Sequence, residues 1–285
     1  MGAWRPAAAG LADALAFLSR FALPKRAATA DTPAPSPNAL GLDRAFVWFG
    51  PAGLVLGCIW TFPALALPEL FGWGVGTASP APQWAQALLA GWIWLFLSVW
   101  TTFGLHWDGT ADLGDAEGSG ATGERFRQIL GDSRLGAFGA LRLLLVFGGE
   151  WCAVSWHAAR VFAAGDPAPA AALALPLVLA PAWGRAAAVL LAHLGPPRKG
   201  PGLGALACAA ARPGIRALYR IAGVAVCAGL VLLGLPLWRA GMLLLAQMFL
   251  LRRMAGLARR EGGLSGDFFG AAIEEGTLCF LLFTL

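Results

Sequence analysis

The sequence predicts an all-α, polytopic membrane protein, with about seven transmembrane helices and one further helix at the membrane interface. Hydrophobic residues make up 58% of the 285 residues, charged residues make up only 13%, and the mean hydropathy is +0.66. These values lie well outside those of ordinary soluble domains. Long apolar segments also recur at lengths close to the roughly 20 residues that a helix needs to cross a bilayer. The chain from 1 to 285 is therefore predicted to form a single membrane-embedded domain.

Residues 1–45 are predicted to lie at the membrane surface. The segment Leu11–Leu23 is interrupted by Asp13 and Arg20, so it lacks the continuous apolar core of a signal peptide. We expect it to form an amphipathic helix whose apolar residues, Phe17 and Leu18 among them, dip into lipid. Residues 27–38 are rich in Ala, Pro, Thr and Ser, which is typical of a flexible insert.

Seven apolar segments are the candidate transmembrane helices, and charge predicts their orientation. If the N-terminus is cytoplasmic, most loop Lys and Arg residues fall on the cytoplasmic face, and only Arg160 and Arg239 lie near span ends on the other. This asymmetry satisfies the positive-inside rule and brings every polar motif to one membrane face. The predicted spans are Phe46–Leu70, Trp84–Leu105, Phe138–Ala164, Ala170–Leu194, Ala217–Leu235, Gly241–Leu257 and Phe268–Leu285.

Residues 105–136 form an acidic loop that carries the strongest chemical signal. Asp108, Asp112 and Asp115 are spaced i, i+4 and i+7, which on a helix places all three carboxylates on one face. Because like charges this close repel, the spacing indicates a cation among them, and oxygen ligands suit Mg²⁺ or Mn²⁺ shared with substrate phosphates. The pattern therefore predicts phosphoryl-type chemistry. An exposed acidic turn without a ligand is the alternative.

Charged residues inside predicted spans are costly unless they have partners, so they are functional candidates. Glu274 is expected to face the bundle interior. Arg185 is a candidate for binding carboxylates or phosphates, with a structural ion pair as the alternative. In the Gly-rich segment 258–274, Asp267 either caps the last helix or extends the carboxylate cluster.

Three polar residues beside the acidic motif complete the candidate chemistry. His106 is a candidate proton acceptor or hydrogen-bonding partner of a substrate. Arg134 is a candidate anion ligand, and its neighbour Ser133 is better explained as a helix cap. The five cysteines are scattered, so they indicate neither a zinc site nor a disulfide framework. No dense basic run interleaved with aromatic residues is present, which argues against a nucleic-acid partner.

Four motifs in this order resemble the cobalamin synthase family, also called the adenosylcobinamide-GDP ribazoletransferases. They are Phe17–Pro24, His106–Asp115, Asp132–Gly139 and Gly262–Glu274. Four ordered motifs are specific together, although each alone is weak. One departure is Pro196-Pro197-Arg198, where the family has Tyr-Ala-Arg, so this chain lacks the aromatic side chain of that motif. No acidic residue of the family pattern is missing, so we expect the activity to be retained.

The resemblance implies a bacterial inner-membrane, Mg²⁺-dependent transferase whose active face is cytoplasmic. It implies that adenosylcobinamide-GDP is joined to α-ribazole or its 5′-phosphate and that GMP is released. Asp132 is the first candidate proton acceptor because it lies outside the helical triad. The implied metal ligands are Asp108, Asp112, Asp115 and Asp132; the implied catalytic residues are Asp132, His106, Arg134 and Glu274; the implied substrate-binding residues are Arg134, Arg185, Arg198, Gly202, Gly204, Gly266 and Asp267.

Two other functions remain as alternatives. The acidic spacing is also similar to that of CDP-alcohol phosphotransferases, which would act on a CDP-linked donor and not on a corrinoid. A cation transporter would need acids near the bilayer midplane in two related halves, whereas these acids gather at one face without an internal repeat. The number of metal ions and the choice of lower-ligand base stay open, and so does the oligomeric state, a homo-oligomer included.

Overall fold

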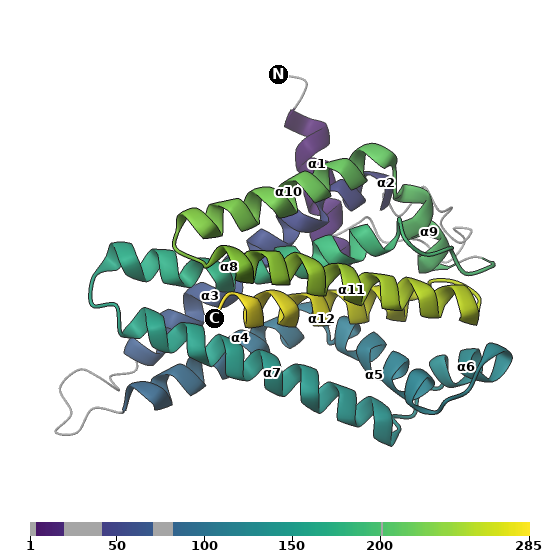
Figure 1. The fold of residues 1–285 in the computed structure, drawn as a ribbon, viewed down its shortest axis with the longest axis horizontal. Helices are drawn as coiled ribbons and strands as arrows, with labels where there is room; N and C mark the ends of the chain where they lie inside the picture. Colours follow the sequence, from purple (N-terminus) through teal and green to yellow (C-terminus); the bar gives the residue numbers. More distant parts are fainter. Residues whose placement is uncertain (1–3, 20–41, 71–81, 201) are drawn as a thin grey trace, which may run out of the picture.

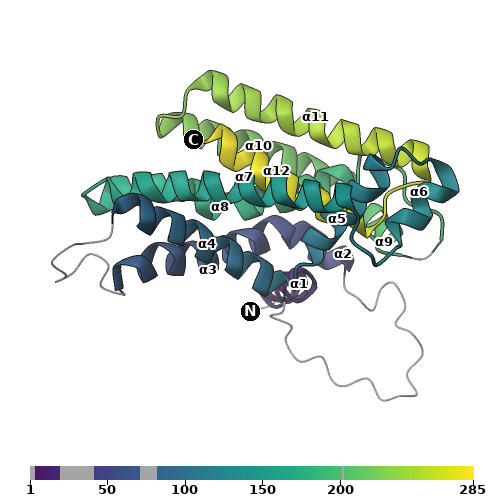
Figure 2. The same cartoon turned by 90° about the horizontal axis from the view of Figure 1, so that it is seen from below.

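A computed structural model describes residues 4–19, 42–70, 82–200 and 202–285, and within these ranges the protein is a bundle of helices without a β-sheet (Figures 1 and 2). The predicted all-α class is confirmed. The elements are α1 (Trp4–Leu18), α2 (Leu42–Ala45), the 3₁₀ turn η2 (Phe46–Trp48), α3 (Phe49–Leu70), α4 (Gln83–Thr102), α5 (Leu105–Gly118), α6 (Gly123–Leu130), α7 (Ala137–Phe162), α8 (Pro167–Leu191), α9 (Leu203–Ala210), α10 (Pro213–Leu232), α11 (Leu237–Glu261) and α12 (Gly266–Phe283).

Six helical segments in the described ranges are long and apolar enough to cross a membrane. They are Phe46–Pro68, Gln83–Thr102, Ala137–Phe162, Pro167–Leu191, Pro213–Leu232 and Leu237–Glu261. The seventh predicted span corresponds to α12, which has only 18 residues and carries three acidic ones, Asp267, Glu274 and Glu275. Its position explains this composition, because α12 lies in the middle of the bundle, where polar side chains have protein partners (Figure 1).

Close backbone contacts hold α12 against α5 and α8. A Cβ atom added to Gly109 of α5 would lie 2.8 Å from Cα of Asp267, and one added to Gly184 of α8 would lie 2.3 Å from the carbonyl oxygen of Ile273. Only glycine permits these approaches. Small residues at such contacts let helices pack tightly where lipid supplies no hydrophobic driving force. Close contacts at glycines also join α3 to α8, where Gly53 and Gly57 lie against the α8 backbone.

The polar segments gather at one end of the bundle, as the sequence predicts. The connection between α11 and α12 lies there together with α2, α5, α6 and α9 (Figures 1 and 2). The α7–α8 and α10–α11 connections lie at the opposite end, near the C-terminus (Figure 1). Sequence motifs that are far apart along the chain therefore share one face of the molecule.

The N-terminal helix differs from the expectation. It begins at Trp4 and its last residue is Leu18, whereas the prediction placed it at Leu11–Leu23. Phe17 stacks on Phe49 with 5.7 Å between ring centroids, and Leu18 is 3% exposed, so both pack on the bundle. Arg20 and the predicted insert 27–38 lie outside the described residues.

We predict that Gly57→Ala lowers the unfolding temperature of the protein in detergent. Its Cβ would lie 2.1 Å from the carbonyl oxygen of Val178, and overpacking of this kind costs about 1–3 kcal/mol. Gly148→Ala on α7 is the matched control, because a Cβ there meets nothing within 4 Å. Thermal unfolding should separate the two variants by several degrees, and equal unfolding temperatures would contradict the close α3–α8 packing.

Candidate active site

The segment predicted as an acidic loop is mostly helical. Phe103 and Gly104 have positive φ values of 56° and 67°, so the chain turns sharply after α4 and starts α5 at Leu105. The three aspartates therefore lie on one helix: Asp108 is exposed, while Asp112 and Asp115 are partly buried. A second short helix, α6, follows before the chain reaches Asp132.

Asp112 is the centre of the acidic cluster. It is partly buried, and the negative charges of Asp108, Asp115 and Asp267 act on it from α5 and α12. Burial is the largest cause, followed by these three carboxylates, and together they raise the pKa of Asp112 to about 7. None of the side-chain hydrogen bonds or ion pairs between described residues involves the Asp112 carboxylate. Asp112 thus lies among negative charges without a cationic partner of its own in the described part of the chain.

Asp115 has a different environment from its two neighbours. Its carboxylate accepts hydrogen bonds from the backbone N–H groups of Gly136 at 2.7 Å and Gly139 at 2.8 Å. A Cβ on either glycine would lie 2.3 Å from a carboxylate oxygen of Asp115. These contacts explain the glycines of the Asp132–Gly139 motif, because Asp115 caps the start of α7 and ties it to α5. A metal-ligand role for Asp115 stays a prediction.

Asp132 and Arg134 form a pair in the turn before α7. The guanidinium of Arg134 donates to both carboxylate oxygens of Asp132, at 3.0 Å from Nε and 2.6 Å from Nη2. These bonds lower the pKa of Asp132 to about 2. A carboxylate held this way is a weak proton acceptor, so the proposed role of Asp132 as a base requires the pair to separate.

The segments that precede α9 and α12 are joined by two backbone hydrogen bonds. Leu264 donates its N–H to the carbonyl oxygen of Pro196 at 2.8 Å, and Arg198 donates its N–H to that of Leu264 at 3.2 Å. The positive charge of Arg198 consequently acts on Asp267. Gly204 packs against this segment, because a Cβ there would overlap the carbonyl oxygen of Leu264.

The other two predicted glycines have different surroundings. A Cβ on Gly202, which precedes α9, would meet nothing within 4 Å. Gly266 is the first residue of α12 and lines a pocket beside the acidic cluster. Gly266 is therefore close to the candidate chemistry, whereas nothing in the described contacts requires a glycine at 202.

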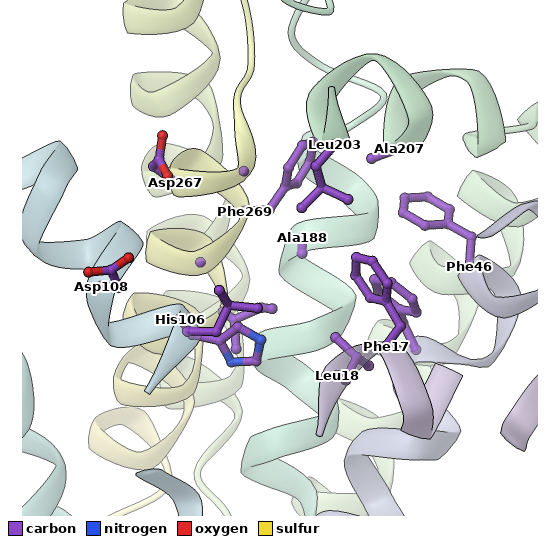
Figure 3. A pocket seen from close by; sticks show the side chains of 15 residues that line it. Phe17, Leu18, Phe46, His106, Asp108, Ala188, Leu203, Ala207, Asp267 and Phe269 are labelled. Carbon is purple, nitrogen blue, oxygen red and sulfur yellow. The ribbon is translucent and has the colours of Figure 1, made fainter. Parts of the chain in front are cut away.

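This pocket has a polar side and an aromatic side (Figure 3). His106 and Asp108 of α5 and Asp267 of α12 lie on one side, while Phe17 of α1 and Phe46 of η2 lie on the other. The pocket is thus bounded by helices from both ends of the sequence.

A second polar cluster lies within the bundle. His106 Nδ1 is 3.2 Å from Glu274 Oε1, so Glu274 faces the interior as predicted and its partner is His106. Arg185 is 1% exposed, donates to the carbonyl oxygen of Pro181 at 3.0 Å, and lies 5.4 Å from the ring centroid of Trp60. The side chain does not reach solvent in this arrangement. The predicted contact between Arg185 and a substrate phosphate therefore has no support in its placement.

Sequence reasoning missed Glu150, which belongs to the same interior cluster. It is 0% exposed on α7, and the described residues offer neither of its carboxylate oxygens a hydrogen-bond partner. Nε and Nη2 of Arg185 are likewise unpaired within those ranges. The available signal was a single acid inside the predicted span Phe138–Ala164, which is the same signal that singled out Glu274.

A network of ion pairs, also missed, ties the acidic helix to its neighbours. Arg142 of α7 pairs with Glu117 of α5 at 3.1 Å and also with Glu275 of α12. Glu117 pairs in turn with Arg253 of α11. The side chain of Glu275 is only 14% exposed, so this acid belongs to the network and does not face solvent.

The acidic cluster suits a hard cation in its chemistry but is not a closed ligand set. Among the residues that the structure describes, no three His, Cys, Asp or Glu side chains are arranged to hold a metal ion. The donors nevertheless fit: among the described residues the partly buried Asp112 carboxylate has no protein donor, and the charges of Asp108 on α5 and Asp267 on α12 both act on it. Carboxylate oxygens of this kind are the ligands that Mg²⁺ and Mn²⁺ prefer, usually together with water and phosphate.

Comparison with known proteins identifies the family. Residues 10–285 match the family model described as cobalamin-5-phosphate synthase. The chain belongs to the cobalamin-5-phosphate synthase family. It is 41% identical over 263 residues to the adenosylcobinamide-GDP ribazoletransferase of Nitratidesulfovibrio vulgaris strain DP4, covering 91% of this chain and 90% of the relative. It is 33% identical over 274 residues to the enzyme of that name from Citrobacter koseri, covering 94% and 96%.

The family resemblance inferred from the four motifs is therefore confirmed. No solved structure matches the chain.

We predict that Asp112→Asn raises the stability of the metal-free protein at pH 7.5. Because the folded-state pKa of Asp112 is about 7 and lies above its unfolded value of 3.8, Asp112 favours folding at low pH. Its contribution is lost as the pH rises from about 4 to about 7, and at higher pH the charged form is destabilising. In detergent with EDTA, the unfolding temperature of Asp112→Asn should therefore exceed that of the wild type at pH 7.5, and the two temperatures should converge near pH 4. If the variant and the wild type differ by the same number of degrees at both pH values, the proposed repulsion between carboxylates is contradicted.

Proposed function

We propose that the chain is an adenosylcobinamide-GDP ribazoletransferase of the bacterial cytoplasmic membrane. It would join adenosylcobinamide-GDP to α-ribazole or α-ribazole 5′-phosphate, giving adenosylcobalamin or its 5′-phosphate, and release GMP. The observation that carries the proposal is the match over nine-tenths of the chain to relatives of that name. The acidic cluster beside a pocket, at the polar end of the bundle, supports it independently.

In this reaction a hydroxyl of the ribazole attacks the phosphorus that bears the cobinamide group, and the bond to GMP breaks. Asp108, Asp112, Asp115 and Asp132 are the proposed ligands of Mg²⁺, for which Mn²⁺ could substitute, and Asp267 of α12, whose charge acts on Asp112, is proposed to extend this set. When bound, the ion would neutralise charge on the diphosphate. Asp115 would act largely by holding the start of α7, since both of its oxygens already accept backbone N–H groups.

Two exposed arginines at this end of the bundle are the proposed phosphate ligands. Arg134 is exposed and paired with Asp132, so it can exchange that carboxylate for a phosphate of the donor. Arg198 is exposed next to Asp267 and would bind the GMP portion. Arg185 is better explained as a positioning residue, because it is buried and its charge acts on Glu274.

His106 is the proposed acceptor of the hydroxyl proton. It lines the pocket, its Nδ1 lies against Glu274, and no hydrogen bond between described residues engages its Nε2. Glu274 would fix the orientation of the imidazole and stabilise its protonated form. Asp132 is the second candidate, and its pairing with Arg134 makes it the weaker base.

The active face is proposed to be cytoplasmic. The arginines of residues 123–134, 198–216 and 259–260 belong to the polar end, whereas Arg160 and Arg239 lie near the other end. This distribution follows the positive-inside rule, and the nucleotide-linked donor would then be drawn from the cytoplasm.

The decisive experiment uses the purified protein in detergent with adenosylcobinamide-GDP and α-ribazole, with Mg²⁺ or with EDTA. GMP and cobalamin should form together in the presence of Mg²⁺ and should be absent with EDTA. Asp108→Asn and Asp112→Asn should lower kcat by at least about 100-fold, because charge stabilisation at a transferring phosphoryl group is worth several kcal/mol.

Asp166→Asn, at the opposite end of the bundle, is the matched control and should keep normal activity. A folded wild-type protein that released no GMP would contradict the proposal. CDP-linked donors would then be screened to test the phosphotransferase alternative.

A further inference from the structure

We infer that the pocket beside the acidic cluster binds the benzimidazole base of the acceptor riboside. The inference rests on the proposed function and adds to it the place where one substrate lies and the residues that select it. It begins from the lining of the pocket, which is aromatic on one side and acidic on the other (Figure 3).

The aromatic part of the pocket suits a flat, apolar ring. Phe17, Phe46, Phe49 and Phe269 line it, and Phe49 stacks on Phe17 with ring centroids 5.7 Å apart. Ala188 of α8 and Ala207 of α9 contribute small side chains to the same lining. A planar group entering here would meet ring faces and edges, which is the arrangement that aromatic groups prefer.

The polar part of the pocket indicates how a bound riboside would be oriented. Asp108 and Asp267 line the same pocket and belong to the acidic cluster proposed to hold the cation. A ribose attached to a ring among the phenylalanines would extend toward these carboxylates and toward His106. The reacting hydroxyl would then reach the proposed proton acceptor while the base stays in the apolar part.

The side chains that line the pocket favour the benzimidazole base of the acceptor over the guanine ring of the donor. Among the described residues that line the pocket, only His106, Asp108 and Asp267 carry polar side chains. A guanine ring has several donors and acceptors, and burying them among phenylalanines without partners is unfavourable. A dimethylbenzimidazole has two methyl groups and few polar atoms, so it gives up few hydrogen bonds to water when it enters the pocket.

A second pocket provides a comparison within the same molecule. It lies between α3, α8 and α10, and its lining includes Leu54, Leu218 and Ala222 but none of the residues of the acidic cluster. A group bound there would have no carboxylate to react with. This pocket therefore supplies an apolar control site that none of the candidate catalytic residues lines.

The pocket assignment is tested by measuring KM for each substrate separately. Ala207→Leu narrows the space beside the proposed ring site and should raise KM for α-ribazole by about 10-fold or more, the scale of one or two misplaced methyl groups. KM for adenosylcobinamide-GDP should stay within about twofold of wild type. Ala222→Leu, the same change in the second pocket, should alter neither value.

Phe17→Leu is a second, gentler variant, because Phe17 is only partly buried. It should also raise KM for α-ribazole, by several fold, and should reduce the preference of the enzyme for a dimethylbenzimidazole riboside over an adenine riboside. Unfolding temperatures check that each variant is folded before its kinetics are compared.

The outcomes separate this inference from the proposed function. If the wild-type protein forms cobalamin but folded Ala207→Leu and Phe17→Leu retain the wild-type KM for α-ribazole, the pocket assignment is wrong and the proposed function stands. A rise in KM for adenosylcobinamide-GDP alone would assign the pocket to the donor and overturn the inference. If the wild type forms no cobalamin, the proposed function and this inference fail together.

Discussion

The close packing of α12 against α5 and α8 determines where the polar groups of this protein lie. Gly109 of α5 permits contact with the backbone of Asp267, and Gly270 of α12 permits contact with the backbone of His106. This packing of α5 against α12 has two consequences. Asp267 comes beside the aspartates of α5 at the polar end of the bundle, and one layer deeper Glu274 meets His106.

The interior of the bundle holds charged side chains of opposite sign. Arg185 and Glu150 are almost fully buried on neighbouring helices, and opposite charges at such a site offset part of the cost of removing each from water. Their unpaired atoms are the positions at which buried water is expected, since buried polar groups rarely remain without a partner. Because charged residues in a membrane bundle are expensive, their concentration beneath the pocket is consistent with a role in positioning the residues above them.

Much of the fold could be predicted because its signals are local. Long apolar segments specify spans, and the arginine distribution specifies which ends lie together, so the predicted segment Phe138–Ala164 differs from α7 by only about two residues at its far end. The acidic spacing predicted a helical register, and α5 has it. The extent of α1 was wrong because its apolar residues pack on the bundle, which the sequence of that segment alone does not reveal.

The parts of the site that could not be predicted depend on contacts between distant segments. Asp115 is spaced like a metal ligand, yet its carboxylate accepts two backbone N–H groups from residues more than 20 positions away. Glu275 is next to Glu274 in sequence but belongs to a different set of partners, through Arg142. Sequence spacing identifies which acids share a helix face, whereas tertiary packing decides which of them is left free for a ligand.

A double-mutant cycle on metal binding tests whether α5 and α12 contribute to one cation site. Mn²⁺ binding to the purified protein would be measured by electron paramagnetic resonance for wild type, Asp108→Asn, Asp267→Asn and the double variant. Each single change should weaken binding, and the two effects should be non-additive by more than about 0.5 kcal/mol, as for residues that share a partner. Unchanged Mn²⁺ affinity in Asp267→Asn, or strictly additive effects, would show that α12 does not belong to the site.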